Sequence, residues 1–388
     1  MSAMEKDLDL SDASDLLRCL SSTPFASETA TPLTGGIGNY TFRVRLQAPY
    51  EERNTLVVKH AKPYLPSNKS FEFPTARQSF EVGMLKGIAD ASVGSNTLVS
   101  VPKVHYFDED AHIIIMDDAG EHTQTLKQLL LDSPGTLTAE LATKIGAELG
   151  TFLAQLHAWG ASDDAADARE WAAGHSLAKR IAVYATYGRL LSTLEGADER
   201  IPELREPSLP LDEHTKETIN ALVTARTRDI NESRETLTMG DFWPGNVLVR
   251  LQPAGQLDGL VVVDWELART GRTGLDVGQF AGDVRVLKHF VRSATLCADA
   301  LVGALLRAYA AQRLGEDGSW VGVATAHVGA HLVAWGPRIA YESKTRELTR
   351  ELVEEGARYL KEVFTRSDEH WRAEDFIEQF VGFASTAP

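Results

Sequence analysis

The sequence predicts an α+β fold of two lobes, with a small antiparallel β-sheet lobe followed by a larger, mainly α-helical lobe. Segments with the two-residue alternation of strands are concentrated in the first part of the chain, and helical periodicity dominates after about residue 137. At 388 residues, the chain is also longer than one ordinary core requires. We expect an N-terminal lobe at 1–116, a hinge at 117–122 and a C-terminal lobe at 123–388.

The N-terminal lobe is expected to begin with a helix and a strand hairpin. Residues 8–22 have the spacing of a short amphipathic helix, with Ser11 or Asp12 as its N-cap. In 40–46, apolar and polar residues alternate, which is typical of a half-buried strand. The apolar run at 55–61 predicts the partner strand.

The remaining elements follow the same two periodicities. Residues 76–89 predict a helix, and two more strands are expected before residue 118. In the C-terminal lobe we expect helices throughout, with strands only around 247–251 and 260–265. The polar stretch at 161–170 is expected to be a loop.

The composition of the chain argues against several classes of binding partner. The formal net charge of −16 argues against nucleic acid, whose phosphates require a basic surface. No apolar run approaches the length of a membrane span, and the N-terminus shows no secretory signal. The two cysteines form no disulfide framework or metal cluster. We therefore expect a cytoplasmic protein, monomeric or homodimeric, with no nucleic-acid or membrane partner.

Three features of the N-terminal lobe suggest nucleotide binding. Lys59 lies in the second strand, from which it can reach phosphates, and Glu81 on the next helix can pair with it. Each also has a common alternative, a solvated strand lysine and an exposed helix charge. Glycines let a backbone approach a phosphate closely, although a simple hairpin turn is the more frequent origin of such a cluster. The turn contains Gly35, Gly36 and Gly38, followed by Asn39.

Acidic and amide side chains mark two loops of the C-terminal lobe. Asp241 and Asn246 have the D-x4-N spacing of a catalytic base and a metal ligand, although both residue types also cap turns. Asp264 follows an apolar strand, and Glu266 is expected two positions along on the same side of an extended backbone. Carboxylates so placed are suited to Mg²⁺. Together with the N-terminal features, this order indicates a protein-kinase-like fold that uses ATP and Mg²⁺.

The chain from about Leu33 to Phe364 resembles the aminoglycoside phosphotransferase and choline kinase-like superfamily. The resemblance rests on LTGGIGNYTFRVRLQAPY, TLVVKHAKP, MGDFWPGNVLVR and VVVDWELARTGRTGLDVGQFAGD. Within the superfamily, the chain is most similar to methylthioribose kinases and 4-hydroxytryptamine kinases. The resemblance implies that Asp264 and Glu266 bind the metal, that Asp276 braces the catalytic loop, and that adenine lies against the backbone near Met116 and Asp118.

Two positions depart from the superfamily pattern. Met239 stands where His usually precedes the Gly-Asp of the catalytic loop. Methylthioribose kinases use two adjacent arginines late in the chain, whereas here Arg338 is the nearby candidate. His327 and His331 have a zinc-compatible spacing, but we expect them to pack beneath the substrate pocket because no H-E-x-x-H motif is present.

We therefore expect an ATP-dependent kinase that phosphorylates a hydroxyl of a small molecule, with Asp241 as the base. Trp243, Trp335 and Arg338 are candidates for contacts with the acceptor. The acidic composition and Trp243 favour an amine-bearing acceptor resembling a hydroxytryptamine. The alternatives are a methylthioribose or sugar kinase and a nucleotide-binding pseudokinase with a regulatory role. A protein kinase is disfavoured because no A-P-E sequence follows Asp264.

Overall fold

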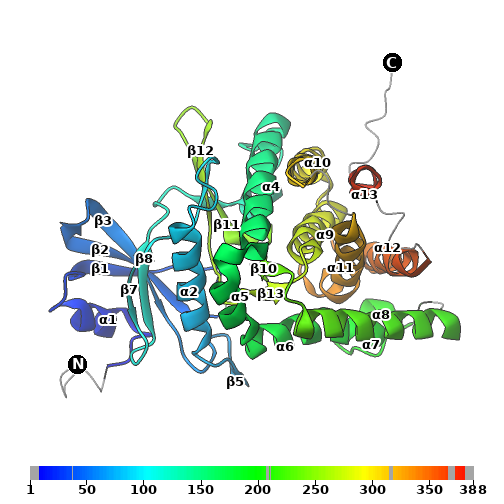
Figure 1. Cartoon of the computed structure of the whole chain (residues 1–388), viewed down its shortest axis with the longest axis horizontal. Helices are drawn as coiled ribbons and strands as arrows, with labels where there is room; N and C mark the ends of the chain where they lie inside the picture. The colour runs from blue at the N-terminus through cyan, green and yellow to red at the C-terminus, as the bar shows by residue number, and fades with distance from the viewer. Residues whose placement is uncertain are drawn as a thin grey trace. The chain divides into compact units, whose positions relative to one another are not determined.

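The computed structural model describes residues 8–36, 38–206, 209, 211–313, 318–365 and 372–380. The chain forms two compact units, Met1–Asp90 with Val101–Thr123, and Ala91–Ser100 with Gln124–Pro388. The first is built on an antiparallel sheet and the second is mainly helical, which confirms the predicted fold class (Figure 1). Residues 91–100, assigned above to the N-terminal lobe, belong to the second unit.

The first unit is organised around a five-stranded sheet of order β1-β2-β3-β8-β7, in which every neighbouring pair is antiparallel. Its strands are β1 (Ser27–Pro32), β2 (Tyr40–Tyr50), β3 (Arg53–His60), β7 (Val104–Asp108) and β8 (Ile113–Asp117). The other elements are α1 (Ala13–Leu20), α2 (Arg77–Asp90) and the small hairpin of β4 (Tyr64–Leu65) and β5 (Asn68–Glu72).

The alternation of buried and more exposed residues along β2 places its apolar side chains in one core cluster. Phe42, Val44 and Leu46 are all buried, and they pack in one cluster with Leu16 and Leu20 of α1. The N-cap of α1 is Asp12, whose side chain accepts hydrogen bonds from the amides of Ser14 and Asp15. Strand β1 was not predicted, because the sequence SETATP contains too few apolar residues to show the strand pattern.

The second unit contains many helices and several short strands. The α-helices are α3 (Leu126–Leu131), α4 (Ala139–Ala161), α5 (Ala166–Ala173), α6 (Ser176–Ala185), α7 (Leu190–Leu194), α8 (Glu213–Glu232), α9 (Gly274–Phe290), α10 (Thr295–Ala311), α11 (Ser319–Ala334), α12 (Arg346–Thr365) and α13 (Ala373–Phe380). Short 3₁₀ turns are η2 (Asp163–Ala165), η3 (Tyr187–Arg189), η4 (Pro202–Leu204), η5 (Pro244–Asn246), η6 (Arg292–Ala294) and η7 (Gly336–Arg338).

Strands of the second unit form a four-stranded sheet and a two-stranded ribbon. The sheet has the order β6-β12-β11-β9, formed by β6 (Val99–Ser100), β12 (Leu257–Val262), β11 (Val247–Leu251) and β9 (Gln124–Thr125). The ribbon pairs β10 (Thr236–Thr238) with β13 (Arg269–Gly271). Only β11 and β12 were expected, because strands of two or three residues are too short to show a period.

Two further predictions were wrong in detail. The stretch at 161–170 is not a loop, because η2 and α5 occupy most of it, and its alanines are strong helix formers. Strand β12 ends at Val262, so the predicted strand at 260–265 extended too far.

Close backbone packing joins α9 to α11, which lie side by side in Figure 1. Gly274, Gly278 and Gly282 recur every four residues on one face of α9. A β-carbon at Gly278 would lie 2.7 Å from the carbonyl oxygen of Ala324, and one at Gly282 would lie 2.9 Å from the β-carbon of His331. The glycines therefore permit α11 to approach at a distance that no larger residue allows.

Helix α10 belongs to a stretch, Arg292–Ala311, that is long and apolar enough to cross a membrane by length and composition. A core helix passes the same test, and 56% of the apolar window is buried inside the structure. Asp299 and Arg307 interrupt the stretch, which explains why no long apolar run is visible in the sequence. The helix packs closely along α4, where Gly146 faces the carbonyl oxygen of Leu301.

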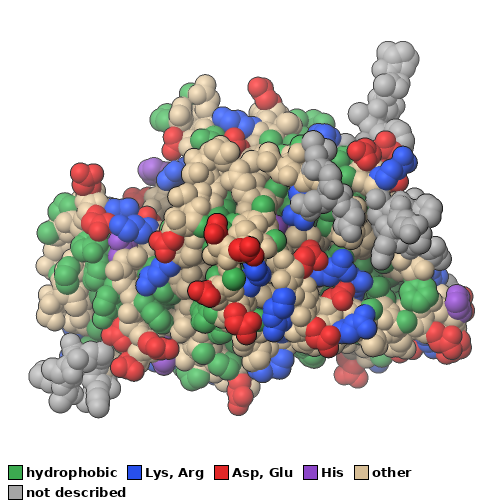
Figure 2. All heavy atoms as spheres, viewed as in Figure 1, with side chains coloured by type: hydrophobic (Ala, Val, Ile, Leu, Met, Phe, Trp, Pro, Cys, Tyr) green, Lys and Arg blue, Asp and Glu red, His purple; other side chains and the backbone are tan. Residues whose placement is uncertain are grey.

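Charged side chains of both signs are intermingled on the face shown in Figure 2. The negative formal charge is therefore not gathered into one acidic patch on that face.

We predict that Gly278→Ala lowers the free energy of unfolding by about 1–3 kcal/mol, because the added methyl group overpacks the contact between α9 and α11. Denaturant titration of the full chain measures this change. Gly188→Ala is the matched control, because its β-carbon would make only ordinary contact, 3.5 Å from the carbonyl oxygen of Val183. An equal loss in both variants would contradict the prediction.

Candidate active site

Lys59 and Glu81 form an ion pair inside the first unit. Lys59 lies on β3 in register with Thr41 of β2 and Ile114 of β8, which places it in the interior of the sheet. Its Nζ is 2.6 Å from Oε1 of Glu81, and the two side chains are only 10% and 1% exposed. Glu81 is therefore not the solvated helix charge of the alternative interpretation. Because buried charges are strongly destabilising when unpaired, each side chain holds the other in place.

The glycine-rich turn is attached to α2 by an arginine that the sequence analysis missed. The guanidinium of Arg77 is buried and donates hydrogen bonds to the carbonyl oxygen of Gly38, at 2.6 Å, and to Oδ1 of Asn39, at 3.2 Å. It also donates to the carbonyl oxygen of Pro74 and stacks on the ring of Phe73. The available signal was its position four residues before Glu81, on the same face of α2.

The turn itself is exposed at its first two glycines. Gly35 has a φ of +110°, a conformation that favours glycine, and β-carbons at Gly35 and Gly36 would meet no atom within 4 Å. Gly38 and Asn39 are buried. One end of the turn is thus open and the other is fixed by Arg77.

The predicted adenine contacts lie at the end of β8. Met116 is buried and stands in register with Val57 of β3 and Val104 of β7. Asp118 follows the strand, and its carboxylate accepts hydrogen bonds from Nε and Nη2 of Arg43 at 2.6 and 2.8 Å. Burial opposes its ionisation, but the bonds from Arg43 and from the amide of Gly120 hold the pKa of Asp118 below its usual value. The Asp118 side chain thus fixes the local backbone.

In the second unit, Asp276 holds the loop that carries Asp241. The two carboxylate oxygens of Asp276 accept hydrogen bonds from the backbone amides of Met239, at 2.8 Å, and Gly240, at 2.9 Å. Nε2 of His157 lies 3.1 Å from Oδ2 of Asp276. Burial disfavours the charged carboxylate, yet these hydrogen bonds, led by that of His157, keep the pKa of Asp276 below its usual value. The structure thus confirms the predicted bracing role of Asp276.

The sharp turn before Asp241 depends on glycine. Gly240 has a φ of +78°, and a β-carbon there would lie 2.0 Å from Nη1 of the buried Arg269. Met239 is fully buried. The loop therefore turns at a position that tolerates no side chain.

Asp241 is positioned by two amide side chains. Its Oδ1 accepts a hydrogen bond from Nε2 of Gln279, and its Oδ2 accepts one from Nδ2 of Asn246, both at 2.9 Å. Burial first, and then the charge of Asp264, raise the pKa of Asp241 to about 7, although the bond from Gln279 acts in the opposite direction. The sequence analysis did not identify Gln279, which lies 38 residues away along the chain.

Asp264 and Glu266 come together at a turn, whereas the sequence analysis predicted that they lie along an extended backbone. Asp264 has a φ of +71°, and β12 has already ended. Trp265 between them is fully buried and donates from Nε1 to the carbonyl oxygen of Val262, at 2.9 Å. Carboxylate oxygens of Asp264 and Glu266 lie within 4.8 Å of each other. Two clustered carboxylates are the donor set that a hard divalent cation prefers, and the charge of Asp264 also acts on Asp241.

The predicted acceptor-binding side chains already have neighbours in the second unit. Trp243 lies with its ring against Gly245, where a β-carbon would be 2.2 Å away, and with Lys127 5.2 Å from its ring centre. Trp335 donates to the hydroxyl of Thr186 and stacks with His331.

Arg338 forms an ion pair with Asp198, and its Nη2 donates to the hydroxyl of Thr193 at 3.0 Å. Its guanidinium is thus used in holding α7 and the following loop.

The two histidines of α11 have separate partners. His327 Nδ1 lies 2.9 Å from the hydroxyl of Tyr187, and burial lowers the pKa of His327 to about 3. His331 Nε2 lies 3.3 Å from Oδ1 of Asp283. They therefore serve helix packing, as expected, and do not converge on one ligand.

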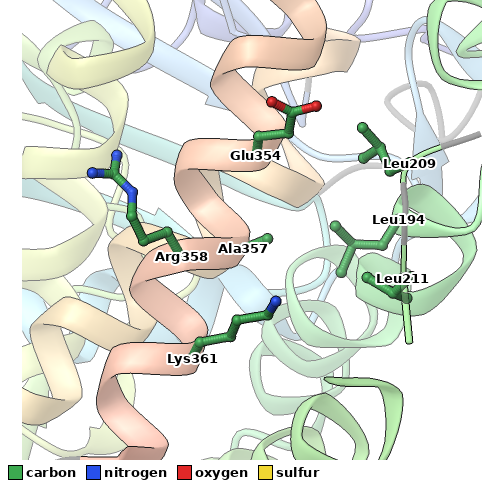
Figure 3. Close-up of a pocket in the computed structure, with 7 residues that line it drawn as sticks. All are labelled: Leu194, Leu209, Leu211, Glu354, Ala357, Arg358 and Lys361. Carbon is green, nitrogen blue, oxygen red and sulfur yellow. The ribbon is translucent and has the colours of Figure 1, made fainter. Parts of the chain in front are cut away.

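A pocket of about 290 Å³ lies elsewhere in the second unit (Figure 3). Leucines from α7 and the segment before α8 face residues of α12 across it. None of the candidate site residues contributes to its lining, which consists of Leu194, Leu209, Leu211, Glu354, Ala357, Arg358 and Lys361.

The chain is similar in sequence to known phosphotransferases. Residues 29–319 match the phosphotransferase enzyme family. A protein of Psilocybe cyanescens named 4-hydroxytryptamine kinase is 32% identical over 78% of this chain and 79% of its own. The protein of that name from Psilocybe cubensis is 29% identical over the same shares. A solved choline/ethanolamine kinase family protein from Mesorhizobium loti is 13% identical and has a TM-score of 0.47, with 94% of this chain and 99% of that one covered.

The matched region contains every candidate nucleotide, metal and catalytic residue from Gly35 to Glu266. The chain therefore belongs to the phosphotransferase enzyme family, whose members transfer a phosphoryl group to a hydroxyl.

Proposed function

We propose that the protein is an ATP- and Mg²⁺-dependent kinase that phosphorylates the hydroxyl of an aromatic amine such as 4-hydroxytryptamine. The observation that carries this proposal is the similarity, over about four fifths of each chain, to two proteins named 4-hydroxytryptamine kinase. Arg338 supports it, because this late arginine, the candidate for an anionic or sugar acceptor, is engaged by Asp198.

Asp241 is assigned as the group that orients the acceptor hydroxyl and takes its proton. Gln279 and Asn246 each bind one of its oxygens, which fixes the plane of the carboxylate. Each oxygen keeps a further lone pair, with which it can accept a hydrogen bond from the hydroxyl. The raised pKa brings Asp241 nearer to neutral pH, where a general base is most effective.

Asn246, Asp264 and Glu266 are assigned as the metal ligands. Since Nδ2 of Asn246 donates to Asp241, the carbonyl oxygen of the same amide is the atom left to bind a cation. The Asp264 and Glu266 carboxylates add the charged oxygens. When bound, Mg²⁺ would neutralise the charge that develops on the transferred phosphoryl group.

The first unit is assigned to the nucleotide. The ammonium group of Lys59, held by Glu81, would bind phosphate oxygens, and the glycine-rich turn would present backbone amides to them. Arg77 fixes the closed end of that turn and so defines where its amides point. Adenine would lie against the backbone at Met116 and Asp118.

Asp241→Asn is expected to reduce kcat by at least about 100-fold, because the amide keeps the shape but cannot take a proton. Steady-state turnover with 4-hydroxytryptamine measures the loss, and nucleotide binding to the variant should be unchanged. Turnover within tenfold of the parent would remove Asp241 from the reaction.

Lys59→Met is expected to raise the KM for ATP by about tenfold or more, the effect of losing a hydrogen bond to a charged group. The KM for the acceptor should change little. Lys62→Met is the matched control, because Lys62 pairs with Asp9, 3.0 Å away. If both variants bind ATP as the parent does, the assignment of Lys59 is wrong.

Glu266→Gln is expected to raise the Mg²⁺ concentration needed for half-maximal activity by about tenfold, because one charged ligand is replaced by a neutral one. Titration of the metal at saturating ATP measures it. Glu351→Gln, at an exposed position of α12, should leave the curve unchanged. Superimposable curves for parent and Glu266→Gln would exclude Glu266 as a ligand.

A further inference from the structure

The buried anchor of the catalytic loop is itself bonded to a tyrosine of α10. Nε2 of His157 lies 3.1 Å from Oδ2 of Asp276, and Nδ1 of the same ring lies 2.8 Å from the hydroxyl of Tyr309. All three residues are at most 1% exposed. The sequence analysis did not identify Tyr309, which lies 152 residues from His157 along the chain. Its hydroxyl is thus the third group in a chain of hydrogen bonds that begins at the loop.

Close packing of α4 against α10 brings these two side chains together. A β-carbon at Gly150 would lie 2.2 Å from the carbonyl oxygen of Leu305, so no larger residue allows this approach. Leu305 and Tyr309 are four residues apart on one face of α10, and Gly150 and His157 are seven apart on one face of α4. The faces that pack at Gly150 therefore carry Tyr309 and His157 against each other.

The ring of Tyr309 is held by two further aromatic side chains. Trp320 of α11 contacts it edge-on, with 5.1 Å between ring centres and 75° between planes. Phe376 of α13 contacts Trp320 in the same way, at 6.0 Å and 90°. Edge-to-face contacts are a favoured arrangement of aromatic rings, and both outer rings are at most 5% exposed. The hydroxyl of Tyr309 is thus kept at one place beside His157.

The positions of the protons follow from what Asp276 accepts. Its two oxygens already receive the backbone amides of Met239 and Gly240. Burial opposes its ionisation, but the pKa of Asp276 still lies below its usual value, so the carboxylate is ionised and can only accept. Nε2 of His157 must then carry the proton at this contact. In an imidazole with one proton, Nδ1 is left as an acceptor, and the hydroxyl of Tyr309 can donate to it.

We propose that Tyr309 is a positioning residue for the catalytic loop, because its hydroxyl donates to Nδ1 of His157 and so fixes the tautomer whose Nε2–H binds Asp276. The inference rests on the proposed function and deepens it, since Asp276 holds the loop that carries Asp241. Tyr309 acts through His157 and takes no part in proton or phosphoryl transfer.

Nuclear magnetic resonance of the full chain, labelled with ¹⁵N-histidine, tests the tautomer directly, because the ¹⁵N shift of a ring nitrogen differs between its protonated and bare forms. The signals of His157 are those lost in His157→Leu. In the parent we expect a protonated Nε2 and a bare Nδ1. Tyr309→Phe keeps the ring contacts and removes only the hydroxyl, and it should lose this single tautomer. A proton on Nδ1 in the parent overturns the proposal.

Steady-state kinetics with 4-hydroxytryptamine test the effect on the reaction. Tyr309→Phe should lower kcat about 3- to 10-fold, the effect of losing one neutral hydrogen bond, and leave both KM values within about twofold of the parent. Tyr187→Phe is the matched control, because the hydroxyl of Tyr187 lies 2.9 Å from Nδ1 of His327 in a similarly buried pair. It should keep the kcat of the parent. Equal losses in the two variants, or an unchanged kcat in Tyr309→Phe, overturn the proposal.

A double-mutant cycle shows whether Tyr309 acts through His157. His157→Leu removes both ring hydrogen bonds, and adding Tyr309→Phe to it should lower kcat no further. The same fractional loss of kcat in both backgrounds would show that Tyr309 acts by another route. Thermal unfolding confirms that each variant is folded, and His157→Gln replaces the leucine variant if that one is not.

The outcomes distinguish this inference from the proposed function. Hydrogen exchange at the amides of Met239 and Gly240, which Asp276 binds, requires no acceptor and should be faster in Tyr309→Phe than in the parent. Unchanged exchange at both amides overturns the positioning role. If the tautomer and the exchange change as expected but the parent does not phosphorylate 4-hydroxytryptamine, the positioning role stands and the choice of this acceptor is wrong.

Discussion

The buried carboxylate of Asp276 is the interaction on which the site in the second unit depends. It joins the loop before Asp241, through the amides of Met239 and Gly240, to His157 of α4 and to its own helix α9. Because the connection to residue 239 is made by its backbone, methionine serves where histidine is usual in the superfamily. The Met239 side chain fills the core, and the loop keeps its anchor.

Much of the site was predictable because its residues occur in motifs that are short in sequence. Asp241 and Asn246 are five positions apart and lie in one loop, and the spacing of Lys59 and Glu81 follows from the order of a strand and a helix. Gln279 and Arg77 were missed because each contacts a partner 38 residues or more away along the chain. The local signal is limited to a shared helix face, which Arg77 has with Glu81 and Gln279 has with Asp276.

Prediction from local sequence patterns also failed where the backbone departs from regular secondary structure. The expectation that the backbone is extended from Asp264 to Glu266 failed because Asp264 takes a left-handed conformation, which its sequence neighbours do not reveal. A residue other than glycine in that region is unfavourable by about 1–3 kcal/mol and is retained where the surroundings over-determine it. The buried Trp265 supplies such surroundings, because it anchors the turn from the middle and leaves the two carboxylates on either side.

The glycine face of α9 has a consequence for how this enzyme can diversify. Helix α11 presents His331 to Asp283 only at the separation that Gly278 and Gly282 allow. A larger residue at either position forces the contact between α9 and α11 to shift. The two glycines therefore constrain how the surroundings of α9 can change in evolution, because a substitution at either one alters the spacing of the two helices.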